Sequence, residues 1–115
     1  MEPLDKPVLI YATFPDRDRA EAVARDLVDM RLAACVNVLD GGVSIYRWEG
    51  ELQRDLECVA IIKTTAALAE RVLAEGRARH PYENPAFLIL PVEGGSASYL
   101  SWLLEEVRTP RAPRG

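Results

Sequence analysis

The spacing of hydrophobic residues changes along the chain, and each change marks a different secondary structure. Residues 8–14, VLIYATF, form a short β-branched and aromatic run between Pro7 and Pro15, which predicts a strand. Apolar residues then recur every three or four positions. Asp18 and Glu21 fit a capping box, and Asp16 is the alternative cap. We therefore expect an amphipathic helix, whose apolar face comprises Ala20, Val23, Ala24, Leu27 and Val28.

Residues 35–64 follow a period of two instead, and no helical stripe interrupts them. This pattern predicts two long consecutive strands. The segment WEGE at residues 48–51 is the expected hairpin tip, because Gly50 can adopt a positive φ without a steric cost. The segment DGG at residues 40–42 predicts a bulge or bend in the first strand.

The last third of the chain predicts two further helices around one strand. Thr64 or Thr65 begins a helical segment that stops close to His80, and residues 86–93, AFLILPVE, read as a strand. Ser96 or Ser98 caps a final helix. The segment 108–115, RTPRAPRG, has no apolar residue of any size to bury, so we expect it to be a disordered tail.

The order strand, helix, strand, strand, helix, strand predicts an α+β fold of the ferredoxin-like type, with an additional C-terminal helix. Right-handed crossovers around a central hairpin give an antiparallel four-stranded sheet with helices on one face. We assign residues 1–107 to one such domain. The strands at residues 8–14 and 58–62 are apolar on both faces, so the face without helices would leave a hydrophobic patch on a monomer. Self-association is therefore expected.

Composition excludes several classes of protein. The 115 residues carry a formal charge of −4, which argues against general binding to nucleic acids or anionic membranes. No apolar run approaches the roughly 20 residues that span a bilayer, and the acidic start MEPLDKP does not resemble a signal peptide, so we expect a cytoplasmic protein without a membrane partner. Cys35 and Cys58 lack zinc-knuckle spacing and read as buried thiols.

Five segments occur in an order and spacing typical of one family: RLAACVNV (31–38), SIYRWEGEL (44–52), IIKT (61–64), HPYENP (80–85) and LPVEGGSASYLSWL (90–103). On these motifs the chain resembles the CutA family of divalent-cation tolerance proteins from about residue 8 to residue 103. The resemblance implies a ferredoxin-like subunit in a PII-like homotrimer, in which long hairpins continue the sheets of neighbouring subunits. It also implies a link to copper and other divalent ions, without an established enzymatic reaction. We expect no cofactor to be required for folding.

The resemblance makes His80, the single histidine, the candidate metal ligand. Proposed metal sites in the family combine a cysteine near the end of the first strand, the histidine of HPY, often a preceding histidine, and a glutamate after the second proline. Here the other three positions are Ala12, Arg79 and Ala86. One imidazole gives weak and unselective metal binding. The alternative is a structural histidine at a helix end, where a cation interacts favourably with the helix dipole.

The remaining candidates concern ligands and subunit contacts. Lys63 and Thr64 precede a helix and are candidates for binding an anion, although a simple helix cap is the alternative. Tyr46 and Trp48 share one strand face near the hairpin tip, which favours a subunit interface. The acids around the tip are typical of a hairpin protected against edge-to-edge pairing. A small polar pocket would place His80 beside Lys63, Tyr82 and Glu83. The candidate ligand-binding residues as a whole are Arg47, Lys63, Thr64, Tyr82 and Glu83.

Three functions compete with a metal-tolerance scaffold. A PII-like sensor would bind a small anion between subunits, lined by Arg47, Lys63, His80 and Tyr82. An acylphosphatase-like hydrolase needs a glycine-rich anion loop after the first strand, but that loop reads FPDRDR. Nucleic-acid binding would need exposed aromatic residues on the central strands and basic flanks. We therefore expect a protein that is not an enzyme and has no catalytic residues.

Overall fold

The computed structural model describes residues 6–107 as a four-stranded antiparallel sheet and three helices. The predicted tail at residues 108–115 lies outside the described residues, as do residues 1–5 of the predicted domain. The elements follow the predicted order. They are β1 (Pro7–Phe14), α1 (Arg17–Asp29), β2 (Cys35–Trp48), β3 (Glu51–Thr65), α2 (Ala66–Ala78), β4 (Phe87–Pro91) and α3 (Ala97–Glu106).

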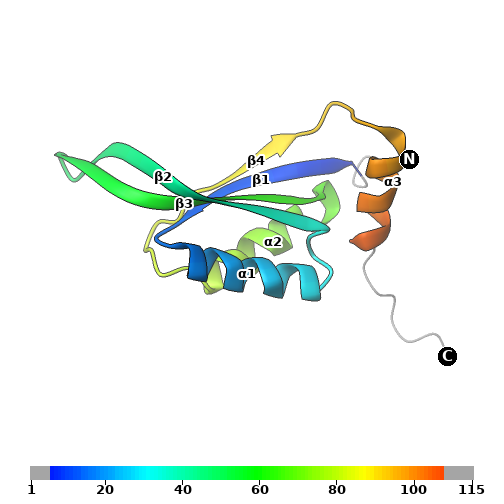
Figure 1. Ribbon diagram of the computed structural model, residues 1–115, viewed down its shortest axis with the longest axis horizontal. Helices are drawn as coiled ribbons and strands as arrows, with labels where there is room; N and C mark the ends of the chain where they lie inside the picture. Colours follow the sequence, from blue (N-terminus) through cyan, green and yellow to red (C-terminus); the bar gives the residue numbers. More distant parts are fainter. Residues whose placement is uncertain (1–5, 108–115) are drawn as a thin grey trace.

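The sheet order is β2-β3-β1-β4, and α1 and α2 lie together on one of its faces (Figure 1). Alternate side chains of β1 and β3 point toward these helices, because strand side chains alternate between faces. Phe14 and Ile10 from β1 and Ile62 from β3 are buried there against Leu27 of α1 and Val72 of α2. This layer is the core, and it confirms the predicted ferredoxin-like fold.

The start of α1 differs in detail from the predicted capping box. Asp16 is the N-cap, and its carboxylate accepts a hydrogen bond of 2.8 Å from the backbone N–H of Arg19. Asp18 lies in the first turn instead. The predicted apolar face was also too wide, because Val28 is 42% exposed whereas Val23 and Leu27 are buried.

The long hairpin extends well beyond the rest of the sheet (Figure 1). β1 pairs with β3 only from Cys58 to Thr65. The hairpin at residues 40–57 therefore extends past the end of β1, and its two strands pair only with each other. We call residues 40–57 the arm. The arm ends in a two-residue turn in which Glu49 and Gly50 both have a positive φ, as the twist of a hairpin favours. The predicted bulge is confirmed by the register shift between Leu39 and Gly42.

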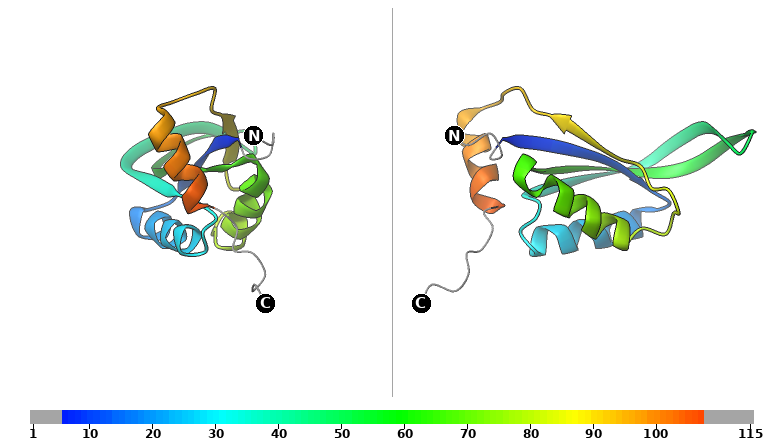
Figure 2. Two further views of the ribbon diagram at one scale, coloured as in Figure 1. Left: turned by 90° about the vertical axis from the view of Figure 1, so that its right-hand side faces the viewer. Right: turned by 180° about the vertical axis from the view of Figure 1, so that it is seen from behind.

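The strand β4 is shorter than the predicted segment 86–93, and it forms the edge of the sheet beside β1. Pairing ends at Pro91, which has no backbone N–H to donate. The helix α3 then lies at the end of the molecule opposite the arm (Figure 2). Its Leu103 and the following Val107 are buried, which joins this helix to the core.

The face of the sheet that α1 and α2 leave open carries large apolar side chains. Leu88 is 60% exposed, and Leu39 and Leu90 are also exposed. On one face of the arm, Ile45, Leu52 and Leu56 are each about two-thirds exposed. Tyr46 and Trp48 are exposed on the opposite face. A single chain therefore leaves uncovered the hydrophobic surface that the sequence predicted.

Substitution of Leu27 by alanine should lower the free energy of unfolding by about 2 to 5 kcal/mol, since it opens a cavity between α1 and the sheet. Val28→Ala, one position along the same helix, should change it by about 0.5 kcal/mol or less, because Val28 is largely exposed. Urea denaturation of both variants measures the difference. Equal losses would contradict the placement of the core face of α1.

Candidate functional site

His80 lies just after α2, where it packs against the end of β1. Its ring stacks on Phe14 with a centroid separation of 4.6 Å, and Tyr82 and Phe87 lie beside it at 4.8 and 5.8 Å. The ring is partly buried. Pro81 follows directly and disfavours a helical conformation at His80, which explains why α2 ends before it.

Both ring nitrogens of His80 already have hydrogen-bond partners. The backbone N–H of Tyr82 donates to Nδ1 at 3.1 Å, so Nδ1 carries no proton in this arrangement. Nε2 then carries the proton and donates to the carbonyl oxygen of Thr13 at 2.7 Å. The imidazole is thus held between two backbone groups, and in this arrangement neither nitrogen presents a lone pair to a metal ion.

One tyrosine–carboxylate pair lies beside this histidine, and a second pair on the arm lies near the first. The Tyr82 hydroxyl donates to Oε2 of Glu57 at 3.1 Å, and the Tyr46 hydroxyl donates to Oδ2 of Asp55. Partial burial and the Glu57 carboxylate raise the pKa of Tyr82 to about 12. The hydrogen bond to Asp55 raises the pKa of Tyr46. Both phenols therefore stay protonated and act as donors at neutral pH.

The positions where the resemblance led us to look for further metal ligands hold residues with other roles. Ala12 is fully buried in the core, and Ala86 has no ligating group. Arg79 joins the two helices, since its Nε bonds Asp26 of α1 at 3.0 Å and its Nη1 bonds the Glu75 carboxylate of α2. Within residues 6–107, no three or more His, Cys, Asp or Glu side chains form a group that could hold a metal ion. The residues of one chain do not fit a metal centre at His80.

The predicted anion-binding residues do not come together in one chain. Lys63 bonds the Tyr99 hydroxyl of α3 at 3.0 Å, and this bond raises the pKa of Lys63. Thr64 is fully buried, and its hydroxyl donates to the carbonyl of Leu32 at 2.6 Å, so it serves the core. Arg47 lies at the arm tip and bonds the Gly50 carbonyl.

Eleven strand positions separate Lys63 from Leu52, the register partner of Arg47. At the usual rise of a strand, this corresponds to about 36 Å. A cleft containing both Arg47 and Lys63 therefore requires a second chain. Likewise, His80 has Tyr82 as a neighbour but not Lys63, which corrects the polar pocket expected around it.

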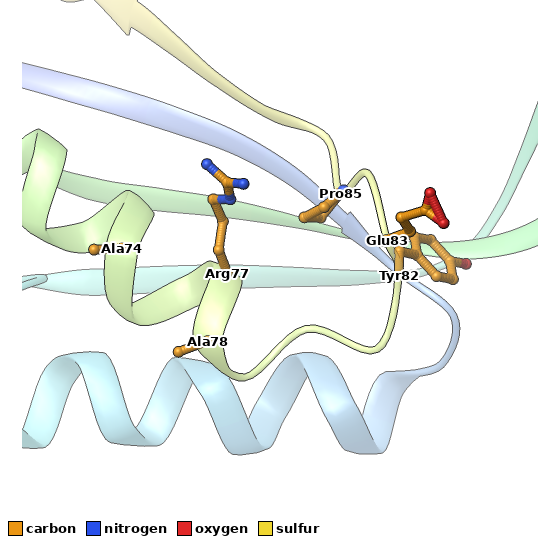
Figure 3. A pocket seen from close by; sticks show the side chains of 6 residues that line it. All are labelled: Ala74, Arg77, Ala78, Tyr82, Glu83 and Pro85. Carbon is orange, nitrogen blue, oxygen red and sulfur yellow. The ribbon is translucent and has the colours of Figure 1, made fainter.

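Glu83 lies at the rim of a shallow hollow of about 410 Å³ beside the end of α2. Figure 3 shows that Arg77 projects from the helix, whereas Tyr82 and Glu83 point away from it on the far side of the loop. The hollow is open, and no buried polar group faces it. Its lining residues are Ala74, Arg77, Ala78, Tyr82, Glu83 and Pro85.

The two residues predicted for a subunit contact both lie on the arm. Tyr46 and Trp48 are 41% and 44% exposed, and their register partners Gln53 and Glu51 place them on one face of the arm. Of the two cysteines, Cys58 is fully buried as predicted. Cys35 is only partly buried, because it pairs with Lys63 near the margin of the sheet.

The sequence analysis did not predict that Asp55 and Glu57 accept hydrogen bonds from Tyr46 and Tyr82. The sequence suggested only charges that protect a hairpin edge. A signal was present, because residues two apart in a strand share a face. The tyrosine partner from the loop after α2 could not be anticipated, since that loop approaches the arm only in the folded chain.

A protein-family model for the CutA1 divalent ion tolerance protein matches residues 8–106. This chain belongs to the CutA1 family. The divalent-cation tolerance protein CutA of Pectobacterium atrosepticum is 41% identical over 106 residues, which are 92% of this chain and 96% of that protein. The chloroplastic protein CutA of Arabidopsis thaliana is also 41% identical, but the matched region covers 88% of this chain and only 56% of that protein.

Solved CutA structures share the fold. The crystal structure of CutA from Xylella fastidiosa has a TM-score of 0.88 at 39% identity, and the match covers 90% of this chain and 99% of that one. The family membership confirms the resemblance inferred from the five motifs. It supports a role in divalent-cation tolerance.

The prediction of a cytoplasmic location is wrong. A CutA structure from Archaeoglobus fulgidus, with a TM-score of 0.86 at 34% identity, is described as a periplasmic divalent-cation tolerance protein. That description points away from the cytoplasm, and the acidic first residues do not decide the location. Within residues 6–107, no helix is long and apolar enough to cross a membrane.

The raised pKa of Tyr82 predicts a stability change at high pH. The folded-state pKa of about 12 exceeds the usual value of 10, so the stabilisation is fully present below pH 10 and is lost as the pH rises toward 12. An ultraviolet titration of the folded protein should show a late tyrosine ionisation that Tyr82→Phe removes. If the ionisation that is lost in Tyr82→Phe has its midpoint near pH 10, the raised pKa of Tyr82 is contradicted.

Proposed function

We propose that this CutA1-family chain acts in divalent-cation tolerance, copper included, as a non-enzymatic homotrimeric binding or scaffold protein. The observation that carries the proposal is the uncovered apolar surface of the single chain. One sheet face exposes Leu88 and Leu90, and the arm exposes apolar side chains on both faces. Such a surface favours association, since burial of apolar area is the main driving force.

The shape of the chain supports association through the arm. The longest extent of the molecule is 54 Å against 22 Å for the shortest, which reflects an arm that projects beyond its own core. A projecting two-stranded ribbon is marginally stable by itself and needs a partner surface. Ile45, Leu52 and Leu56 would then be covered by neighbouring subunits. A PII-like cleft for small anions has no comparable support within one chain, because Arg47 and Lys63 lie far apart.

The metal response would not depend on a centre built around His80. The imidazole is held by Thr13 and Tyr82, and Arg79 places a cationic side chain next to it in the sequence. Any copper bound with useful affinity would have to draw ligands from more than one subunit, because selectivity among divalent ions comes from ligand number and geometry.

Analytical ultracentrifugation at low micromolar concentration should give a trimer. Trp48→Ala should raise the dissociation constant by about 30-fold or more, since a buried tryptophan often contributes 2 kcal/mol or more at an interface. Arg54→Ala, a polar arm position, serves as the matched control and should have little effect. A monomer for the unmodified chain would refute the proposed assembly.

A titration with copper(I) and copper(II) against a competing chelator tests the metal part. The unmodified protein and His80→Ala should show the same weak affinity, because His80 has no free lone pair. Circular dichroism should first establish that the variant is folded. Tight binding that His80→Ala abolishes would overturn this account of the histidine.

A further inference from the structure

The direction of the arm is not fixed by the sheet. β1 ends at Phe14, opposite Cys58, so the arm has no further strand beside it. The hydrogen bonds of Tyr46 and Arg47 stay within the arm. A bare two-stranded ribbon bends easily, and a defined direction needs a contact from outside it.

The base of the arm has the features of a hinge. The β2 strand is bulged between Leu39 and Gly42, and Gly41 has a φ of 88°. A β-carbon at Gly42 would lie 2.8 Å from the carbonyl oxygen of Glu57, so the two backbones touch here. A bulge bends its strand and increases its twist. The arm therefore changes direction at the position of Glu57.

One side chain of the body reaches this hinge. The Tyr82 hydroxyl bonds Glu57 at 3.1 Å. Among residues 6–107, it is the one side-chain hydrogen bond that joins the arm to the rest of the chain. Tyr82 is held in turn by His80 through its backbone N–H and by ring contact at 4.8 Å.

The chain of contacts ends in the core. His80 donates to the Thr13 carbonyl and stacks on Phe14, which is 1% exposed. These contacts thus connect the buried end of β1 to the His80 ring, then to Tyr82, and finally to the Glu57 carboxylate at the hinge. Each of these hydrogen bonds has a defined donor and acceptor, so they can fix the position of Glu57 relative to the core.

We propose that residues 80–82 form a strap that sets the direction of the arm by holding Glu57 at the bulge. His80 anchors the strap to the end of β1, and Tyr82 contacts the arm through its hydroxyl. The inference gives the histidine a positioning role in place of metal ligation. It rests on the proposed function only where the arm is taken to mediate assembly, since the strap itself lies within one chain.

Hydrogen–deuterium exchange of the full chain tests the strap. Tyr82→Phe keeps the ring but removes the hydroxyl, and peptides from residues 42–56 should exchange about 3- to 10-fold faster, as expected for loss of one hydrogen bond. Glu57→Ala should have the same effect. Glu57→Gln should remain close to the unmodified protein, because its amide oxygen still accepts from Tyr82.

Tyr99→Phe is the matched control, since it removes one phenol hydrogen bond, to Lys63, at the other end of the molecule. It should leave exchange in the arm unchanged. Unaltered exchange in both Tyr82→Phe and Glu57→Ala would overturn the strap, whatever the oligomeric state.

Sedimentation of the same samples separates the two proposals. If the unmodified protein is a trimer and Tyr82→Phe leaves exchange in the arm unchanged, the strap alone is refuted. A monomeric unmodified protein whose arm exchanges faster in Tyr82→Phe would refute the trimer and support the strap.

Discussion

Burial of one face of the sheet is the constraint on which the rest of this structure depends. Alternate side chains of β1 and β3 meet α1 and α2, and Phe14, Ile10 and Ile62 are almost completely removed from water there. The helices α1 and α2 cover one face of a sheet whose two faces are both apolar, and α3 lies at its end. The opposite face and the arm are therefore left with hydrophobic surface that the chain alone cannot bury, and this surplus underlies the proposed assembly.

The end of β1 has a second use. Phe14 closes the core and also supports the His80 ring, while the Thr13 carbonyl fixes its Nε2. The loop after α2 is thus anchored where the sheet stops and the arm starts. This position suits a contact that stabilises the arm, because the core lies directly behind the loop and the arm beyond Phe14 has no β1 residues beside it.

The family relationship concerns the role of the whole protein, whereas the contacts around His80 concern what those side chains do. Membership in the CutA1 family supports divalent-cation tolerance for the protein as a whole. The side chains around His80 serve hydrogen bonding and helix–helix contact instead, since Arg79 bridges Asp26 and Glu75. A shared fold does not carry a particular ligand set with it, because function depends on the residues at the site.

The order of elements, the hairpin tip and the bulge followed from the sequence, because hydrophobic period and glycine placement are local properties. The uncovered sheet face followed as well, since strands at residues 8–14 and 58–62 are apolar on both sides. The capping choice of Asp16 over Asp18 did not, because both residues satisfy the same local pattern. Only the tertiary structure decided the roles of Thr64, His80 and Tyr82. Their partners Leu32, Thr13 and Glu57 lie 25 to 67 residues away along the chain, and no spacing rule reaches across that distance.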